Sequence, residues 1–283
     1  MTIRDHAIAS TRTLRPSPTP DPFSPSTTER AERRAFNDSV LRPDLPLHHL
    51  ARGFAAIVRT EAATLLGTVG YAEFGWPEFS EVWWSAARRI TLGESAREDH
   101  DVTGLRGPNQ DAIARYLLIA EPRSLAAEVA RAPVTSGVDP IGELRHWLFG
   151  FGAAGIVTFR ALALLAAHPE QAGTARAELA ATDFTELAAL PYLRACVLES
   201  IRRWPPAQGS DTFAPDRWLD AGRHQPVLPF GTRTAVCPGR NIVLGSAATM
   251  LGALLARREF TLAGQPALDH TELRFLSRRC RRR

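Results

Sequence analysis

The chain is organised around residues 228–243, which read LPFGTRTAVCPGRNIV. A single cysteine, Cys237, stands between a loop rich in glycine and proline and an apolar segment that predicts a helix over about residues 240–256. Pro238 suits the first turn of that helix, where a missing N–H costs nothing. The helix N-terminus would then point at the sulfur and favour the thiolate, which is the form of cysteine that binds metals. A buried structural cysteine at a helix start is the simpler alternative.

Length and composition predict a folded protein of one or two domains, with 45% apolar and 23% charged residues among 283. All 34 basic residues are arginine, the net charge is +4, and part of this excess lies in the last six residues. Such a basic tail is usually solvated, so we expect no nucleic-acid partner. Three cysteines without paired spacing argue against a disulfide framework and a zinc site. Residues 1–26 lack the apolar segment of a signal peptide, so we expect a cytoplasmic protein.

The pattern of apolar residues predicts a mainly α fold. Residues 1–26, rich in Pro, Ser and Thr, are expected to form a disordered lead-in, 27–276 one helical domain, and 277–283 a basic tail. Expected helices cover about 28–41, 48–66, 76–90, 110–118 and 124–131, and short strands are expected near 226–228 and 260–262.

A longer helix is expected from the N-cap Asp139 to about His168. Its middle holds Gly150, Gly152 and Gly155, and each interior glycine costs roughly 1 kcal/mol relative to alanine. Two explanations compete: a flat group pressed against the backbone, or a close crossing with another helix. The segment is apolar enough to resemble a membrane span, but Arg160 near its middle favours a buried core helix and no membrane association.

The glycines also match G-x-G-x-x-G, the fingerprint of dinucleotide binding. That motif has to follow a strand, whereas residues 143–149 continue a helical pattern. A NAD(P)-binding oxidoreductase is therefore the weakest of the functional alternatives.

A further helix is predicted from Pro191 to Trp204, with Glu199 and Arg202 three residues apart on one face. The spacing allows an ion pair, and Arg217 follows in the segment FAPDRW.

Together these three segments resemble the cytochrome P-450 family. Phe230, Cys237, Pro238 and Gly239 match its haem-binding loop, although Arg233 replaces a glycine and Ala235 a basic residue. The resemblance implies that Cys237 is the axial ligand of a haem iron and that Phe230 and Gly239 belong to the cofactor site.

The glycine-bearing helix resembles the family's oxygen-binding helix, with matches at Ala154, Gly155 and Thr158 and with Val157 in place of the acid. This resemblance implies that Ala154 and Gly155 contact the cofactor and that Thr158 helps protonate bound dioxygen. The alternative for Thr158 is a hydroxyl bonded to its own helix.

Glu199, Arg202 and Arg217 resemble the family's buried charge network, which implies a structural role. Arg33 or Arg34 is a candidate partner for a haem propionate.

The resemblance implies a cytochrome P-450-like helical fold with little residual β-sheet, from an N-terminally truncated and internally deleted member of the family. The implied function is a haem-thiolate monooxygenase that acts on a small organic substrate and takes electrons from a ferredoxin or a reductase. A non-catalytic P-450-like helper or remnant is the alternative.

Overall fold

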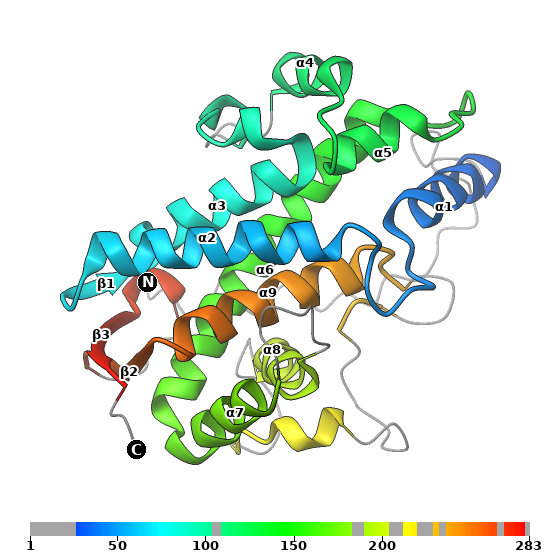
Figure 1. Ribbon diagram of the computed structural model, residues 1–283. Helices are drawn as coiled ribbons and strands as arrows, with labels where there is room; N and C mark the ends of the chain where they lie inside the picture. Colours follow the sequence, from blue (N-terminus) through cyan, green and yellow to red (C-terminus); the bar gives the residue numbers. More distant parts are fainter. Residues whose placement is uncertain are drawn as a thin grey trace, which may run out of the picture.

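The computed structural model describes residues 27–103, 109–182, 190–203, 212–219, 229–231, 236–264 and 269–280. Within these ranges the protein is mainly helical, with nine α-helices and one sheet of three strands (Figure 1). The helices are α1 (Thr27–Leu41), α2 (Ala51–Val69), α3 (Trp76–Leu92), α4 (Gln110–Ile119), α5 (Leu125–Arg131), α6 (Pro140–Ala167), α7 (Pro169–Ala181), α8 (Pro191–Arg203) and α9 (Arg240–Leu255). The strands are β1 (Glu73–Gly75), β2 (Arg258–Leu262) and β3 (Arg274–Arg279).

Helix α6 is the centre of the fold, and α3, α8 and α9 all pack against it (Figure 1). Asp139 caps it, as expected, by accepting a hydrogen bond from the N–H of Ile141 at 3.1 Å. Among the described residues it is the one helix long and apolar enough to cross a membrane, and 61% of its most apolar window is buried within the protein. It therefore serves here as a core helix.

The small antiparallel sheet closes one end of the helical core. Strand β3 lies in the middle and pairs Phe275 with Phe74 of β1 and with Leu262 of β2. The ring of Phe275 is fully buried and meets Phe159 of α6 edge-on, with ring centroids 5.0 Å apart. Because β3 runs to Arg279, the expected boundary at residue 276 falls inside a strand and does not separate a domain from a tail.

The expected helices agree with the observed ones to within a few residues, except that α2 begins at Ala51 instead of residue 48. The ring of His48 explains the later start, because it accepts a hydrogen bond from the N–H of Leu50 at 3.2 Å and holds a turn there. The strand expected at 260–262 is β2, whereas the strand at 226–228 and the lead-in 1–26 lie outside the described residues.

The dinucleotide interpretation of the glycines is wrong, because residues 140–149 are the first turns of α6 and not a strand.

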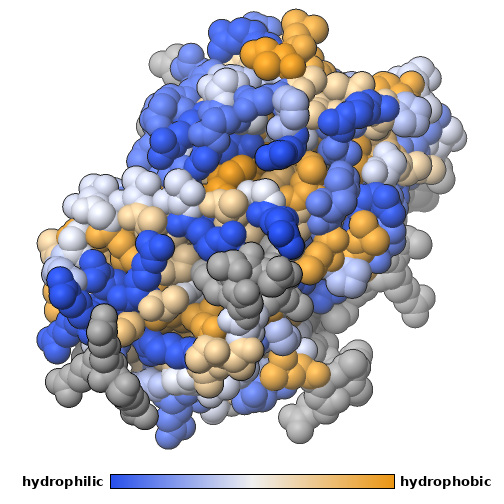
Figure 2. Space-filling view, in the orientation of Figure 1, coloured by the Kyte–Doolittle hydropathy of each residue, from blue (hydrophilic) through white to orange (hydrophobic). Residues whose placement is uncertain are grey.

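Figure 2 shows one face of the protein as a mosaic of hydrophilic and hydrophobic surface, with an apolar patch at the top, over α4. Leu118 and Ile119 at the end of α4 are exposed, and so is Phe149 on α6.

Candidate functional site: a cavity that opens on Cys237

A cavity of about 800 Å³ lies between α1, α6 and the start of α9. This volume is in the range of small-molecule and cofactor sites in proteins, which is roughly 300–1,000 Å³. Apolar side chains form most of its wall: Leu41, Leu125, Trp147, Phe151, Ile242 and Val243. The polar lining comes mainly from α1 and α6 and consists of Arg30, Arg33, Arg34, Asn37, Glu143 and His146.

Cys237 is exposed and contributes to the cavity lining just before α9. Its N–H donates to the carbonyl of Phe230 at 2.7 Å, which closes the loop back on itself. The loop turns at Phe230 and Gly231, whose φ angles are 70° and 80°, a region that glycine enters freely and phenylalanine uncommonly. A Cβ added to Gly239 would lie 3.9 Å from the sulfur, which is an ordinary van der Waals contact.

Some of the cofactor residues expected in this loop line the cavity, and one does not. Cys237, Pro238 and Gly239 line it, whereas Phe230 is partly buried and packs against the hydrophobic core. Phe230 therefore shapes the loop through its carbonyl and lies outside the described wall of the cavity.

Helix α1 is bonded to the cysteine loop on one side and to α6 on the other. Arg34 Nη1 donates to the carbonyl of Val236 at 2.6 Å, next to Cys237. Arg33 Nε donates to Glu143 Oε1 at 2.6 Å, and Asn37 Nδ2 donates to Glu143 Oε2 at 2.8 Å. These bonds bring the N-terminal helix, the central helix and the cysteine to one place.

The same network fixes an aromatic wall of the cavity. Trp147 Nε1 donates to Asn37 Oδ1 at 2.7 Å, and Asn37 in turn holds the buried carboxylate of Glu143. Both oxygens of Glu143 therefore have donors, as a carboxylate that is only 3% exposed requires. The hydrogen bond from Nε1 holds the indole of Trp147 in place as part of the cavity lining.

Two basic side chains at the cavity, Arg30 and His146, have no such partner among the described residues. Arg30 and His146 are exposed, and neither makes a hydrogen bond or ion pair with the part of the chain that the structure describes. They supply free donors for an anionic group at the edge of the cavity.

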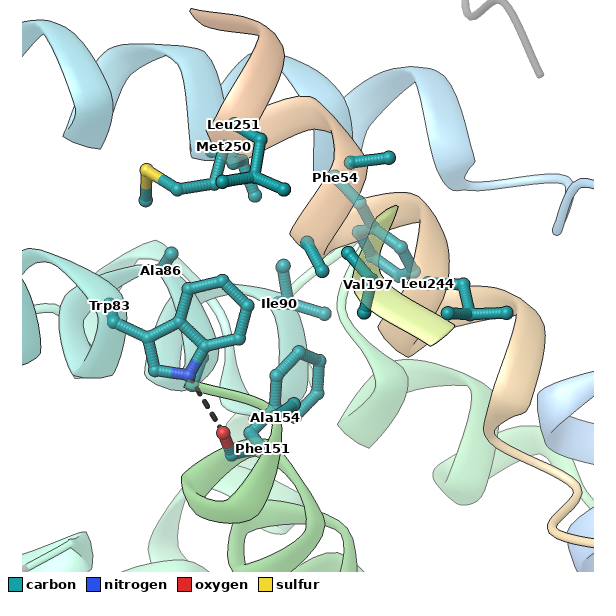
Figure 3. Close-up of a cluster of buried hydrophobic side chains, with 14 of the residues drawn as sticks. Phe54, Trp83, Ala86, Ile90, Phe151, Ala154, Val197, Leu244, Met250 and Leu251 are labelled. Carbon is teal, nitrogen blue, oxygen red and sulfur yellow. Dashed lines mark hydrogen bonds between the residues drawn. The ribbon is translucent and has the colours of Figure 1, made fainter. Parts of the chain in front are cut away.

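The three glycines of α6 serve two different purposes. A Cβ added to Gly155 would come within 2.6 Å of Trp83, and one added to Gly152 within 3.0 Å of Trp84. Both tryptophans lie on α3, and Figure 3 shows the indole of Trp83 donating to the carbonyl of Phe151, at 2.7 Å. For these two glycines the close helix crossing is the correct explanation. Gly150 lines the cavity instead, and a Cβ there would meet nothing within 4 Å.

The remaining expected site residues on α6 lie deeper in the core. Ala154 sits among the buried apolar side chains of Figure 3, beside Phe151. Thr158 is fully buried and donates from Oγ1 to the carbonyl of Ala154 at 2.7 Å. Neither residue, nor Gly155, is part of the described cavity wall. The cavity-facing part of α6 is thus residues 143–151, about one turn or more before the expected segment.

The predicted charge network is confirmed. Glu199 is fully buried, and Arg202 binds both of its oxygens, with Nη2 to Oε1 at 2.7 Å and Nε to Oε2 at 2.9 Å. Arg217 Nε lies 3.2 Å from Oε2, and Trp218 Nε1 donates to the same oxygen at 2.8 Å. Planar guanidinium groups are well suited to this two-point pairing.

Sequence reasoning missed Asn37, Glu143, His146 and Trp147. The signal for three of them was present, because residues 143, 146, 147, 150 and 151 follow the 3.6-residue period of one helix face from the Asp139 cap. Asn37 gave no such signal, since its role depends on how α1 packs against α6.

No family model matches the chain, and no curated protein matches it. Within the described ranges, no three His, Cys, Asp or Glu side chains converge as they would in a protein metal site.

Proposed function

We propose that the cavity binds haem with Cys237 as the axial ligand, and that the protein is a haem-thiolate monooxygenase of the cytochrome P-450 type. One observation carries this proposal: the accessible thiol of Cys237 opens on a large cavity walled by the glycine-bearing helix. Haem iron requires only one axial protein ligand of this kind.

The residues present suit the parts of a porphyrin. Apolar walls from Leu41, Trp147 and Phe151 suit a flat apolar ring system. The open space beside Gly150 lets such a ring approach the backbone of α6. Arg30 and His146, which have no partner among the described residues, suit groups at the ring edge, since arginine pairs well with carboxylates.

A bound haem supplies the oxidation chemistry, and the chain's own residues hold and enclose it. Cys237 would provide the negative thiolate, which pushes electron density to the iron. The Asn37–Glu143–Trp147 network would keep α1 and α6 at a fixed separation around the group. The apolar wall would exclude water from its faces.

One observation favours the non-catalytic alternative. Thr158, the residue expected to help protonate bound dioxygen, donates its hydroxyl hydrogen to the carbonyl of Ala154. It is not part of the described cavity wall. A haem-binding protein that lacks monooxygenase activity therefore stays the second candidate.

The first experiment tests haem binding. The protein is expressed with a haem precursor, purified, reduced and exposed to carbon monoxide. We expect the long-wavelength absorption band typical of thiolate-bound iron, which Cys237→Ala abolishes. Cys280→Ala is the matched control and should keep the band. A colourless wild-type protein, or a band that survives Cys237→Ala, would show the proposal to be wrong.

The second experiment separates the two candidates. The haem-loaded protein is supplied with a ferredoxin and its reductase, and a panel of small organic compounds is screened for incorporation of labelled oxygen from dioxygen. Labelled product supports the monooxygenase. Haem binding without labelled product over the whole panel favours the non-catalytic candidate.

A further inference from the structure

Tyr71 lies on the surface, in the short turn between α2 and β1, and two arginines contact it. Its hydroxyl oxygen accepts a hydrogen bond from Arg258 Nη1 at 2.6 Å and another from Arg279 Nε. The guanidinium of Arg258 also lies over the ring, with its Cζ 4.0 Å from the centroid. Tyr71 is 47% exposed, and the next two residues of the turn, 72 and 73, are exposed as well. Another molecule can therefore reach this phenol, whose oxygen is already bonded to two cations.

The same two arginines face each other across the sheet. Arg258 on β2 and Arg279 on β3 are directly opposite in the strand register, and like charges in such a pair destabilise a sheet. The adjacent pair, Glu259 and Arg278, combines opposite charges. The neutral phenol of Tyr71 offers the two arginines lone pairs but no negative charge. A doubly charged anion at the position of its hydroxyl would bind both guanidinium groups more strongly.

The other two tyrosines of the chain have the opposite surroundings. Tyr116 and Tyr192 are buried, and the hydroxyl of Tyr116 donates to Asp99 Oδ2 at 2.7 Å. Burial is the largest cause that raises the pKa of each to about 12. At Tyr71, by contrast, the largest cause is the hydrogen bond from Arg279, which lowers the pKa. Tyr71 is thus the one tyrosine of the three whose oxygen is both accessible and favoured as a nucleophile.

We propose that Tyr71 is a site of O-phosphorylation by a tyrosine kinase that uses a nucleoside triphosphate. The phenol oxygen forms a bond to the γ-phosphorus, and the bond from that phosphorus to the β,γ-bridging oxygen breaks. The phenol proton passes to solvent and the nucleoside diphosphate leaves. The added group carries a charge of about −1.5 to −2 and three acceptor oxygens. Arg258 and Arg279 would bind it and so connect the turn after α2 to β2 and β3, and this proposal does not depend on haem binding.

Labelling with an aryl sulfonyl fluoride tests the nucleophile in the full-length protein. The phenol oxygen bonds to the sulfur of the reagent, fluoride leaves, and mass spectrometry of the peptides locates the label. We expect label at Tyr71, formed several-fold more slowly in Arg279→Gln. Arg131→Gln is the matched control, because it removes an exposed arginine that pairs with Glu128 on α5, and it should leave the rate unchanged. An Arg279→Gln protein that reacts as fast as the wild type would show that the arginines do not activate this oxygen.

A tyrosine kinase domain of broad specificity, supplied with ATP, tests the modification itself. The kinase is first shown to phosphorylate a peptide of residues 66–76, so that it accepts the local sequence. We expect one phosphate on the folded wild-type protein, at Tyr71, and none on Tyr71→Phe. A folded protein that stays unmodified, or one modified at Tyr116 or Tyr192 instead, would overturn the proposal.

Thermal unfolding of the phosphorylated protein tests the role of the arginines. Pairing of the phosphate with two guanidinium groups should raise the midpoint by a few degrees. The gain should be lost in the double variant Arg258→Gln, Arg279→Gln. If the double variant does not fold, Arg279→Gln alone decides the comparison and should show a smaller gain. An equal gain without the arginines would place the phosphate away from them and contradict the proposed pairing.

Discussion

At the scale of single residues, the structure distinguishes two buried side chains, Glu199, expected to be structural, and Thr158, expected to be catalytic. Glu199 is enclosed by donors from Arg202, Trp218 and the N–H of Ala214, so its charge is compensated without water. Within the described part of the chain, the hydroxyl of Thr158 bonds to the carbonyl of Ala154 on its own helix. The first arrangement holds α8 and the segment 212–219 together, whereas the second is local.

Glu199→Gln should strongly destabilise the protein. The substitution leaves two arginines beside a neutral amide in a buried place, and breaking a buried pair costs about 3–5 kcal/mol. The free energy of unfolding in urea measures this loss. Glu94→Gln is the control: Glu94 is 57% exposed and pairs with Arg89, so its loss should cost less than about 1 kcal/mol. Equal losses in the two variants would contradict a special role for the buried network.

His48 should make stability depend on pH. Burial is the largest cause that lowers the pKa of His48, so the folded protein favours the neutral ring. The unfolded chain binds a proton first, near pH 6.5. The contribution of His48 to the free energy of unfolding is therefore fully present above about pH 6.5. It is lost as the pH falls below that value. The free energy of unfolding measured from pH 5 to pH 8 should fall less steeply at acid pH in His48→Gln. His270, whose pKa burial also lowers, should keep its own share in both proteins.

At the scale of elements, α6 meets α3 on one face and the cavity on another. Gly152 and Gly155 lie under the indoles of α3, while Gly150 faces open space. Helix α6 therefore needs small residues for two reasons: close packing against α3 and open space along the cavity wall. Only the open space along the cavity wall concerns a ligand.

Alanine substitutions at Gly155 and Gly150 should distinguish the glycine needed for helix packing from the glycine that lines the cavity. Gly155→Ala places a Cβ 2.6 Å from Trp83 Cδ1, and overpacking of this kind costs about 1–3 kcal/mol. Gly150→Ala meets nothing within 4 Å and should gain about 1 kcal/mol from better helix propensity. Unfolding midpoints in urea should therefore move in opposite directions. A destabilising Gly150→Ala would show that the space beside this residue is filled in the protein.

At the scale of the whole molecule, the cavity joins the N-terminal helix, the central helix and the C-terminal helix. Arg34 connects α1 to the cysteine loop, and Glu143 connects α1 to α6. The contacts that form the wall of the cavity are therefore also the contacts that hold these distant segments together. A ligand that fills this cavity would contact three segments far apart in the chain.

Haem should accordingly raise the stability of the entire domain. A ligand that binds only the folded state stabilises it by about 2.7 kcal/mol at one hundred times its dissociation constant. We expect one cooperative thermal transition that moves up when haem is added to the wild type. Gly150→Phe, which fills the cavity from α6, should remove the shift while the unliganded midpoint changes little. An equal shift in this variant would place the haem elsewhere.

The sequence by itself determined the helical class, most helix positions and the partnership of Glu199 with Arg202. Periodicity, caps such as Asp139 and the three-residue spacing of charges are local properties, and local geometry fixes them. Tertiary structure alone decided which turn of α6 meets the cavity. The sequence does not distinguish the three glycines, and only the packing of α3 shows that Gly152 and Gly155 belong to the helix crossing while Gly150 does not. It also decided that Asn37, Glu143 and Trp147 form one network, since residues about 110 positions apart meet only when α1 packs on α6.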